Sequence, residues 1–227
     1  MTNGTQVQER LREPSPIPDE VASEAPASTA PSLGFHPFRA LVRLAMRSVG
    51  WQIVGQAPKE AKYVLIAAPH TSNWDLVLML MCGVEYGVWP SWVGKHTIFK
   101  GPFGYFFRAL GGIAIDRRSP QNMVEQMAEK FRKSENLVLA VPPEGTRGHT
   151  ENWKSGFYYI AHTGNVPICL GYLDFKTKRG GLGPMLHPTG DVKADMDIVR
   201  AFYKDKVGRF PHLQGPVRLA AETAPKK

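Results

Sequence analysis

The sequence predicts a single α/β domain in which helices cover a mixed, mainly parallel sheet, preceded by an amphipathic helix. From residue 62 onward, short apolar runs alternate with segments of helical periodicity, and this alternation is typical of parallel strands joined by helices. The chain has 227 residues, of which 43% are hydrophobic and 21% are charged. These values are those of a folded protein of about one domain and exclude a collagen-like, coiled-coil or wholly disordered chain. The sequence contains no internal repeat.

Residues 1–34 have the composition of a disordered tail. They contain no aromatic residue and five prolines, and such a segment cannot bury enough apolar surface to offset its loss of conformational entropy on folding. They also lack the basic start and the continuous apolar core of a secretory signal. Two arginines against five acids give the tail a net charge of −3, so with +8 for the whole chain residues 35–227 carry +11. A basic folded part indicates an anionic partner, which composition leaves open between nucleic acid, anionic lipid and a phosphorylated substrate.

Residues 35–51 form the predicted amphipathic helix. Arg39, Arg43 and Arg47 are spaced i, i+4 and i+8 and therefore line one helical face, while apolar side chains such as Val42 occupy much of the remainder. A basic amphipathic helix beside a disordered tail suits a membrane surface. An ordinary surface helix with a solvated arginine stripe has the same pattern, so the sequence pattern alone leaves both interpretations open.

The folded domain is expected to span residues 52–218, followed by a flexible C-terminus at residues 219–227. The expected strands are Tyr63–Ala68, Ser91–Gly94, Gly112–Ile115, Asn136–Val141, Val166–Phe175 and Gly183–His187. The expected helices lie near Asn73–Tyr86, Gly101–Leu110, Pro120–Ser134, Trp153–Thr163 and Asp195–Val207. Ser119 and Pro120 supply an N-cap and a first-turn proline for the third of these helices.

Neither long apolar segment is expected to span a membrane. Residues 76–93 carry Glu85 in their middle, and residues 155–173 are broken by a Gly-Asn-Val-Pro turn. The two cysteines, Cys82 and Cys169, are too few for a disulfide scaffold or a structural zinc site. Both are therefore expected to be reduced and buried, and no metal site is expected.

The sharpest chemical feature is the pair His70 and Asp75, on the turn after strand 63–68. Residues five apart face different directions on one helix or strand, so the two side chains can meet only because a turn separates them. The turn follows the carboxyl end of a strand, where open α/β sheets tend to bind ligands. A carboxylate that holds one imidazole nitrogen fixes the tautomer, so that the other nitrogen can take a proton from a substrate hydroxyl. A structural histidine beside a first-turn acid would give the same spacing.

Two further segments carry groups suited to an anion. The turn after strand 136–141 presents Glu144, Gly145, Thr146 and Arg147 together. The planar guanidinium of Arg147 suits a phosphate, although a polar turn with an internal Glu–Arg pair is the alternative. Lys95 and Arg117, on either side of a glycine-containing segment, could line an anionic pocket as well. Between them lie five aromatic residues that would serve as core packing or as the wall of an apolar channel, namely Phe99, Phe103, Tyr105, Phe106 and Phe107.

Taken in order over residues 70–170, these pieces resemble the glycerophospholipid acyltransferase family typified by 1-acylglycerol-3-phosphate acyltransferase. The first block is the His-x4-Asp pair, and the second runs from Gly104 to Arg117. The third is Pro-Glu-Gly-Thr-Arg at 143–147, followed by Lys154, and the fourth is Val-Pro-Ile at 166–168. One block alone would be a weak signal, whereas four at compatible spacing make a specific match.

The resemblance implies a mixed α/β fold, with residues 52–218 as an acyltransferase domain. It implies acyl transfer from a thioester, acyl-CoA or acyl carrier protein, to a hydroxyl of a glycerol-phosphate-type lipid such as lysophosphatidic acid. His70 would be the general base and Asp75 its orienting partner, with no cofactor and no metal. The residues implied around the acceptor's phosphate and glycerol are Arg117, Glu144, Gly145, Thr146 and Arg147, with Lys95 as a further binding group. The resemblance also favours the membrane interpretation of residues 35–51, at an anionic surface on the cytoplasmic face.

Three other functions stay open on the sequence. A catalytically silent lipid-binding protein could keep the same scaffold, although an inactive site has no chemical need for both His70 and Asp75. A hydrolase would give the acyl group to water instead of a lipid. A nucleic-acid binder is suggested only by the charge of +11, since the basic residues are scattered and match no recognition motif.

Overall fold

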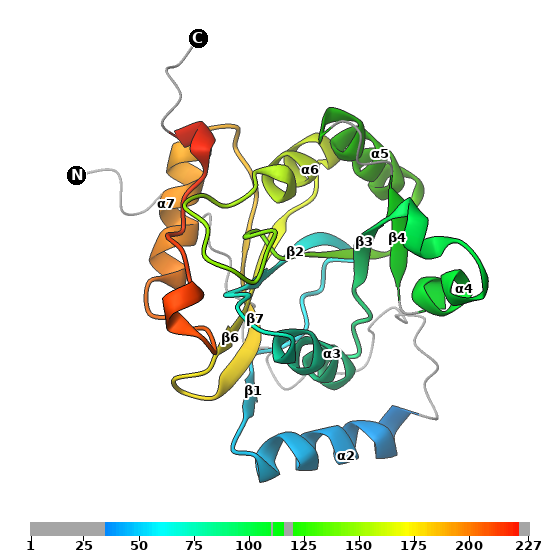
Figure 1. Ribbon diagram of the computed structural model, residues 1–227, viewed down its shortest axis with the longest axis vertical. Coiled ribbons are helices and arrows are strands. Elements are labelled where there is room, and N and C mark those ends of the chain that lie inside the picture. Colours follow the sequence, from blue (N-terminus) through cyan, green and yellow to red (C-terminus); the bar gives the residue numbers. More distant parts are fainter. Residues whose placement is uncertain (1–34, 110, 116–119, 223–227) are drawn as a thin grey trace, which may run out of the picture.

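A seven-stranded sheet organises the protein, with strands in the order β1-β7-β6-β2-β5-β3-β4 (Figure 1). The computed structural model describes residues 35–109, 111–115 and 120–222. The strands are β1 (Gln52–Val54), β2 (Lys62–Ala68), β3 (Ser91–Lys95), β4 (Gly112–Ile115), β5 (Leu137–Val141), β6 (Ile168–Asp174) and β7 (Arg179–Leu186). Neighbouring strands are parallel except β6 and β7, which pair antiparallel. The predicted mixed, mainly parallel sheet is therefore confirmed.

The edge strands β1 and β7 differ from the sequence prediction. β1 is absent from the predicted strands because three residues are too few to show an alternating pattern. β7 begins at Arg179 instead of Gly183 because its first half is rich in glycine. A Cβ atom at Gly181 would lie 2.2 Å from the carbonyl oxygen of Val54, so the close approach of β1 requires glycine there. The glycines of β7 therefore have two effects: they remove the strand pattern from the sequence, and they let β1 and β7 approach closely enough to pair.

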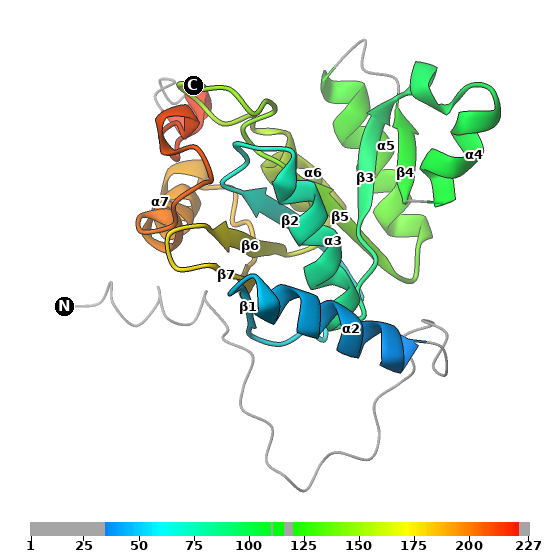
Figure 2. The ribbon, with the colours of Figure 1, turned by 60° about the horizontal axis from the view of Figure 1, so that its bottom comes forward.

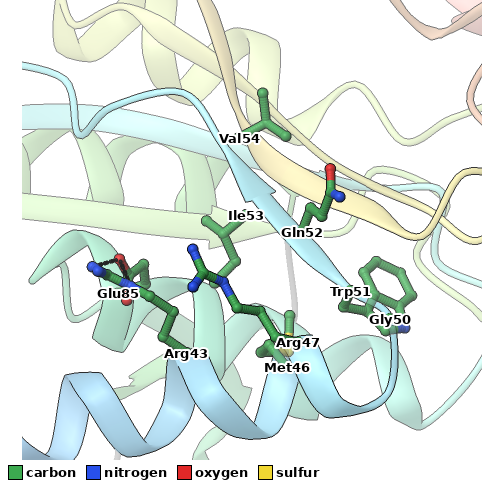
Figure 3. Close-up of a pocket in the computed structure, with 9 residues that line it drawn as sticks. All are labelled: Arg43, Met46, Arg47, Gly50, Trp51, Gln52, Ile53, Val54 and Glu85. Atoms are coloured by element: carbon green, nitrogen blue, oxygen red, sulfur yellow. Dashed lines mark hydrogen bonds and ion pairs between the residues drawn. The ribbon is translucent and has the colours of Figure 1, made fainter.

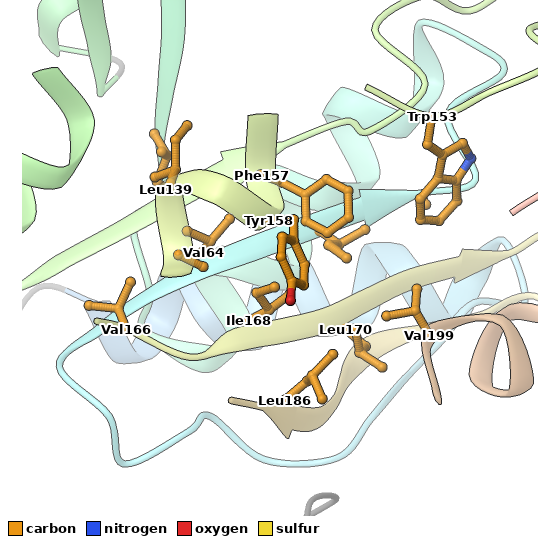
Figure 4. Close-up of a cluster of buried hydrophobic side chains, with 14 of the residues drawn as sticks. Val64, Leu139, Trp153, Phe157, Tyr158, Val166, Ile168, Leu170, Leu186 and Val199 are labelled. Atoms are coloured by element: carbon orange, nitrogen blue, oxygen red, sulfur yellow. The ribbon is translucent and has the colours of Figure 1, made fainter. Parts of the chain in front are cut away.

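Helices cover both faces of the sheet, as the layers in Figures 1 and 2 show. They are α2 (Phe35–Ser48), α3 (Trp74–Tyr86), α4 (Pro102–Ala109), α5 (Pro120–Lys133), α6 (Gly156–Gly164) and α7 (Val192–Tyr203). Side chains alternate along β2, so Val64 and Ile66 pack with α5, α6 and α7, whereas Tyr63 and Leu65 face the α3 side. Figure 4 shows Val64 in this core with Phe157 and Tyr158 of α6. The predicted helical cover is thus confirmed on the two faces, and the predicted N-cap Ser119 lies outside the described residues.

The C-terminal boundary of the fold lies beyond the expected one. Leu219 is buried and forms an isolated bridge with Trp153, which explains why α6 starts at Gly156 instead of Trp153. Residues 220–222 form a short 3-10 helix, and Glu222 pairs with Arg200 of α7. The expectation of a flexible segment from residue 219 is therefore wrong for residues 219–222, because apolar burial and an ion pair hold them.

Two of the three arginines of α2 bond to α3, while Arg43 and Arg47 are also exposed. Arg43 donates a 3.0 Å hydrogen bond through Nε to Glu85 of α3, and Arg39 donates to the Glu85 main-chain oxygen. Figure 3 shows Arg43 and Arg47 on the wall of a cavity of about 530 Å³ between α2, β1 and α3. Glu85 lies 42 residues from Arg43 along the chain, so no local pattern could indicate the pairing.

The apolar side chains of α2 fall into two sets. Val42 and Met46 are buried with Trp51 against α3. A second set is exposed, namely Phe38, Leu41 and Leu44 on the helix and Val49 directly after it. Within the described ranges, no helix has both the length and the apolar character needed to cross a membrane.

Candidate active site

Two loops leave the same edge of the sheet and build the site. β2 and β5 are adjacent and parallel, with Ile66 paired to Val141, so the turns that follow both strands start side by side. The first turn carries His70 and Asp75, and the second carries Glu144 and its neighbours. The site therefore lies past the carboxyl ends of the central strands, as the sequence predicts.

His70 and Asp75 meet across the first turn. His70 Nδ1 lies 3.2 Å from Asp75 Oδ2, and the imidazole is partly exposed whereas the carboxylate is buried. A carboxylate can only accept a hydrogen bond, so Nδ1 carries the hydrogen and Nε2 keeps a lone pair. Nε2 has no hydrogen bond to any residue that the structure describes, and it is therefore available as a base.

Asp75 is held by its own turn. Its Oδ2 accepts hydrogen bonds of 2.8 Å from the backbone N–H groups of Thr71 and Ser72, and the Ser72 hydroxyl donates to Oδ1 at 2.9 Å. Burial opposes ionisation of this carboxyl, but the bonds from His70 and Ser72 outweigh burial and lower its pKa. The carboxylate is thus charged at neutral pH and stabilises an imidazolium when His70 takes up a proton.

The start of α3 is capped by the residue before its N-cap position. Asn73 occupies the N-cap position of α3 but makes no side-chain capping bond. The Ser72 hydroxyl instead accepts from the Trp74 N–H at 3.1 Å. Ser72 therefore has a capping role and also orients Asp75, which leaves it unsuited as a nucleophile.

Glu144 lies behind His70 instead of facing solvent. Its side chain is buried, with 5% of the residue exposed, and Oε1 accepts a 2.9 Å hydrogen bond from the His70 backbone N–H. Oε2 is buried and has no hydrogen-bond partner among the described residues. Burial raises the pKa of Glu144, although its bonds to the backbone partly oppose the shift. The residue links the two loops and positions the turn that carries His70.

Substitution of Glu144 by glutamine is expected to change the pH dependence of stability. An acid with a raised pKa in the folded state stabilises the fold below its ordinary pKa of 4.5, and this contribution is lost as pH rises through the folded pKa. Glutamine keeps the acceptor for the His70 N–H and does not titrate. The free energy of unfolding of the parent relative to Glu144→Gln should therefore fall as pH rises above about 4.5 and then level off.

Denaturant unfolding at a series of pH values measures this difference. Glu135→Gln, which removes an exposed acid, is the matched control for the loss of one negative charge. A difference between the parent and Glu144→Gln that stays constant with pH would show that Glu144 does not titrate in this way.

A cavity of about 1510 Å³ opens against this pair of loops. Most of its lining is apolar and comes from α3, the central strands and α6, for example Met79, Val93 and Ile160. His70 and Asp75 line it as well. The candidate base therefore adjoins a large apolar volume of the kind that suits a hydrocarbon chain.

The cationic groups of the cavity come from the second loop. Arg147 and Lys154 both line the cavity, and the 2.7 Å bond from the Lys154 N–H to the Pro143 oxygen holds their segments together. Gly145 has a φ of +68°, a left-handed conformation that favours glycine, and it allows the chain to turn sharply past Lys154. Lys154 is absent from the residues predicted to bind substrate, although it follows the Pro-Glu-Gly-Thr-Arg block.

The other predicted binding residues are placed differently. Thr146 is exposed and its hydroxyl accepts from the Gly148 N–H at 3.2 Å, a bond local to the turn. Lys95 ends β3, and its side chain is not described, while Arg117 lies outside the described residues. The prediction that these two cations line the pocket therefore stays a prediction.

A segment near the C-terminus supports the first loop, and no pattern in the sequence indicates it. The Phe210 N–H donates to the Thr71 hydroxyl at 3.2 Å, and a Cβ atom on Gly208 would lie 2.8 Å from that hydroxyl. Gln214 braces the segment by accepting from the Gly208 N–H at 2.9 Å. Phe210 and Thr71 are 139 positions apart in the chain, so only the folded structure brings them together.

Residues 51–170 match the acyltransferase family. This range is just over half of the 227-residue chain and contains both loops of the site. The chain belongs to the acyltransferase family. The four sequence blocks that indicate this family all overlap the matched range, and the predicted resemblance is confirmed.

Two relatives of this acyltransferase-family chain are similar over part of their length. A 1-acyl-sn-glycerol-3-phosphate acyltransferase of Streptococcus pneumoniae is 27% identical over 130 residues, which cover 52% of this chain and 47% of that protein. The chain thus spans about half the length of the curated relative that it matches. The crystal structure of PlsC, the 1-acyl-sn-glycerophosphate acyltransferase from Thermotoga maritima, aligns with a TM-score of 0.49 and 16% identity over 75% of this chain and 78% of that one.

The described part of this family member holds no cluster of three or more histidine, cysteine or acidic side chains that could bind a metal ion. Cys82 and Cys169 are free and buried, as predicted.

Proposed function

We propose that the protein transfers a fatty acyl group from an acyl thioester to a hydroxyl of a glycerol-phosphate-type lipid such as lysophosphatidic acid. The observation that carries this proposal is the His70–Asp75 pair, 3.2 Å apart, on the wall of a large apolar cavity that also holds Arg147 and Lys154. Membership of the acyltransferase family and the similarity to a 1-acyl-sn-glycerol-3-phosphate acyltransferase support the same reaction.

The reaction needs one base and no covalent acyl-enzyme. His70 Nε2 removes the proton of the acceptor hydroxyl while that oxygen attacks the thioester carbonyl, and Asp75 stabilises the imidazolium that forms. The tetrahedral intermediate collapses with cleavage of the carbon–sulfur bond, and the imidazolium returns its proton to the leaving thiolate. The products are an ester and a free thiol, so protons and electrons balance without a further reactant.

The substrates divide between the two parts of the cavity. Arg147 and Lys154 carry charges that suit the phosphate of the acceptor, with Lys95 and Arg117 as further candidates from the sequence. The apolar lining suits the hydrocarbon of the acyl donor, which could be carried by coenzyme A or by acyl carrier protein. No metal or other cofactor is required by this chemistry.

The proposed location is an anionic surface on the cytoplasmic face of a membrane, with α2 lying in its plane. The exposed apolar side chains of α2 support this orientation, and Leu41 and Leu44 are 60% and 66% exposed. Amphipathic helices bind membranes by burying such a stripe at the level of the headgroups. In this orientation the exposed Arg43 and Arg47 would be close to the anionic headgroups.

The test is product analysis with the full-length purified chain. The chain is incubated with pooled lysolipids and with acyl-CoA or acyl carrier protein donors, and the lipids are identified by mass spectrometry. The expected result is a new diacyl lipid from a phosphate-bearing lysolipid with one of the two donors. Free fatty acid without lipid product would indicate a hydrolase, and lipid binding without consumption of the donor would indicate a silent binding protein. Either result contradicts the proposal.

A further inference from the structure

The aromatic residues around α4 separate into two sets with opposite surroundings. Phe99 is buried and packs edge-on against Phe107, which lines the large cavity. Phe103, Tyr105 and Phe106 are 72%, 80% and 57% exposed. Neither of the two roles open on the sequence, core packing or a channel wall, accounts for the exposed set.

Packing and a hydrogen bond hold α4 against the cavity wall. Phe106 packs on Phe107 with ring centroids 5.7 Å apart, so the exposed and the cavity-lining set are in direct contact. Arg108 donates a 3.1 Å hydrogen bond to the Phe99 main-chain oxygen, and its guanidinium lies 5.5 Å from the centre of the Phe99 ring. A Cβ atom on Gly104 would lie 2.1 Å from that same oxygen, so α4 rests directly on the preceding turn.

The charge of this region complements an anionic surface. The sequence has no aspartate or glutamate from Gly87 to Ile115, while Lys95, Lys100 and Arg108 fall within that stretch. Lys100 is exposed immediately before α4. Aromatic side chains flanked by cations are favoured at the boundary between lipid headgroups and hydrocarbon.

We propose that α4 inserts Phe103, Tyr105 and Phe106 into the lipid surface and forms the entrance through which acyl chains pass between the bilayer and the cavity. The inference rests on the proposed function, which supplies the lipid substrates. In Figures 1 and 2, α4 lies on the side of the molecule toward which the beginning of α2 points, and α7 lies on the opposite side. The two proposed membrane elements are therefore compatible with one docking surface.

A lipid surface fits this patch better than a protein partner. Stable protein interfaces bury about 1,200–2,000 Å² in total, which exceeds what three side chains on one short helix supply. Attachment to a membrane by a single weak apolar element is readily reversible, and a second element makes it stable. The α4 rings supply that second element beside the apolar stripe of α2.

The test places an environment-sensitive fluorophore on α4 of the full-length chain. Phe103→Cys provides the site, and Ala201→Cys, exposed on α7, provides the matched control. Cys82 and Cys169 are buried and burial raises the pKa of each thiol to about 12, so labelling is confined to the introduced cysteine. Vesicles of phosphatidylcholine and phosphatidylglycerol should produce a blue shift, a severalfold rise in emission and quenching by nitroxides on the acyl chains at position 103 alone.

A second variant measures the energetic contribution of the same patch. Phe103→Ser should weaken binding to these vesicles by about tenfold, since burial of a phenylalanine in hydrocarbon is worth at least that factor. Ala201→Ser should leave vesicle binding unchanged. Circular dichroism of each variant reports whether the fold is intact, and the fluorophore reports contact independently of affinity.

Three outcomes would overturn the inference. In the first, the emission at position 103 stays that of an aqueous site although the chain sediments with vesicles. In the second, the chain does not bind vesicles. In the third, the emission responds to acyl carrier protein and not to lipid. Acyl transfer by the same labelled protein is followed with short-chain substrates that form no micelles. Transfer without lipid contact at position 103 contradicts the entrance alone, whereas contact without transfer to any acceptor contradicts the proposed function.

Discussion

Replacement of His70 by alanine is expected to abolish acyl transfer while the fold and vesicle binding persist. Its Nε2 atom is the proposed base, on the cavity wall beside Asp75, and loss of a general base costs about 10²- to 10⁴-fold in rate. The imidazole already borders the cavity, and Asp75 keeps its bonds from Thr71 and Ser72 when the ring is removed, so the fold should persist. The rate of diacyl lipid formation under saturating donor and acceptor measures the effect.

The matched control is His187→Ala, which removes an exposed histidine that is not part of the cavity lining. This variant should retain the full rate. If His70→Ala also retained it, another group would have to take the hydroxyl proton, and the assignment of His70 as the base would be wrong.

Replacement of Asp75 by asparagine is expected to impair both catalysis and stability. In Asp75→Asn an amide replaces the carboxylate that accepts from the Thr71 and Ser72 N–H groups, so its NH₂ group faces one or more of these donors. The imidazole of His70 also loses the partner that fixes its tautomer. We expect kcat to fall by about 10²- to 10³-fold with little change in KM, since the carboxylate acts on the transition state. The unpaired buried N–H groups should lower the free energy of unfolding by about 1–3 kcal/mol.

The stability effect of Asp75 should depend on pH in a defined direction. Its pKa is lowered in the folded state, so its contribution is fully present above the ordinary value of 3.8 and is lost as pH falls through the folded pKa. The difference between the parent and Asp75→Asn should therefore be constant near neutrality and shrink in acid. The control is Asp205→Asn, which changes an exposed aspartate in the same way. If Asp205→Asn lost as much stability or kcat as Asp75→Asn, the specific role of Asp75 would be contradicted.

The features that the sequence predicts correctly are those that depend on local pattern. The sequence pattern indicates the strand before Pro69, the turn and the start of α3. These three elements are enough to predict that the side chains of His70 and Asp75 can meet. The buried position of Glu144 is not readable, because it follows from the pairing of β2 with β5, and the bond that it makes joins residues 74 positions apart. A charged residue in a polar turn is more often solvated, and only tertiary structure reverses that expectation.

The same distinction applies to the outer helices. Period and composition predict that α2 is amphipathic, but the direction of its arginines depends on Glu85 of α3. The aromatic residues near α4 are visible in the sequence, yet their division into buried and exposed sets depends on how α4 rests on the oxygen of Phe99. The sequence period shows which side chains lie on the same face of a helix, but the neighbouring elements determine whether that face is buried or exposed.

The contact between Phe210 and Thr71 has a consequence for the evolution and dissection of this protein. The family match ends at residue 170, but the segment 207–214 that steadies the turn carrying His70 lies outside it. Substitutions in this unmatched region therefore act on the turn that carries His70, through its contact with Thr71. A fragment of residues 51–170 would lack this support and also β7 and α7. The four motifs are therefore not expected to form a working site without the rest of the domain.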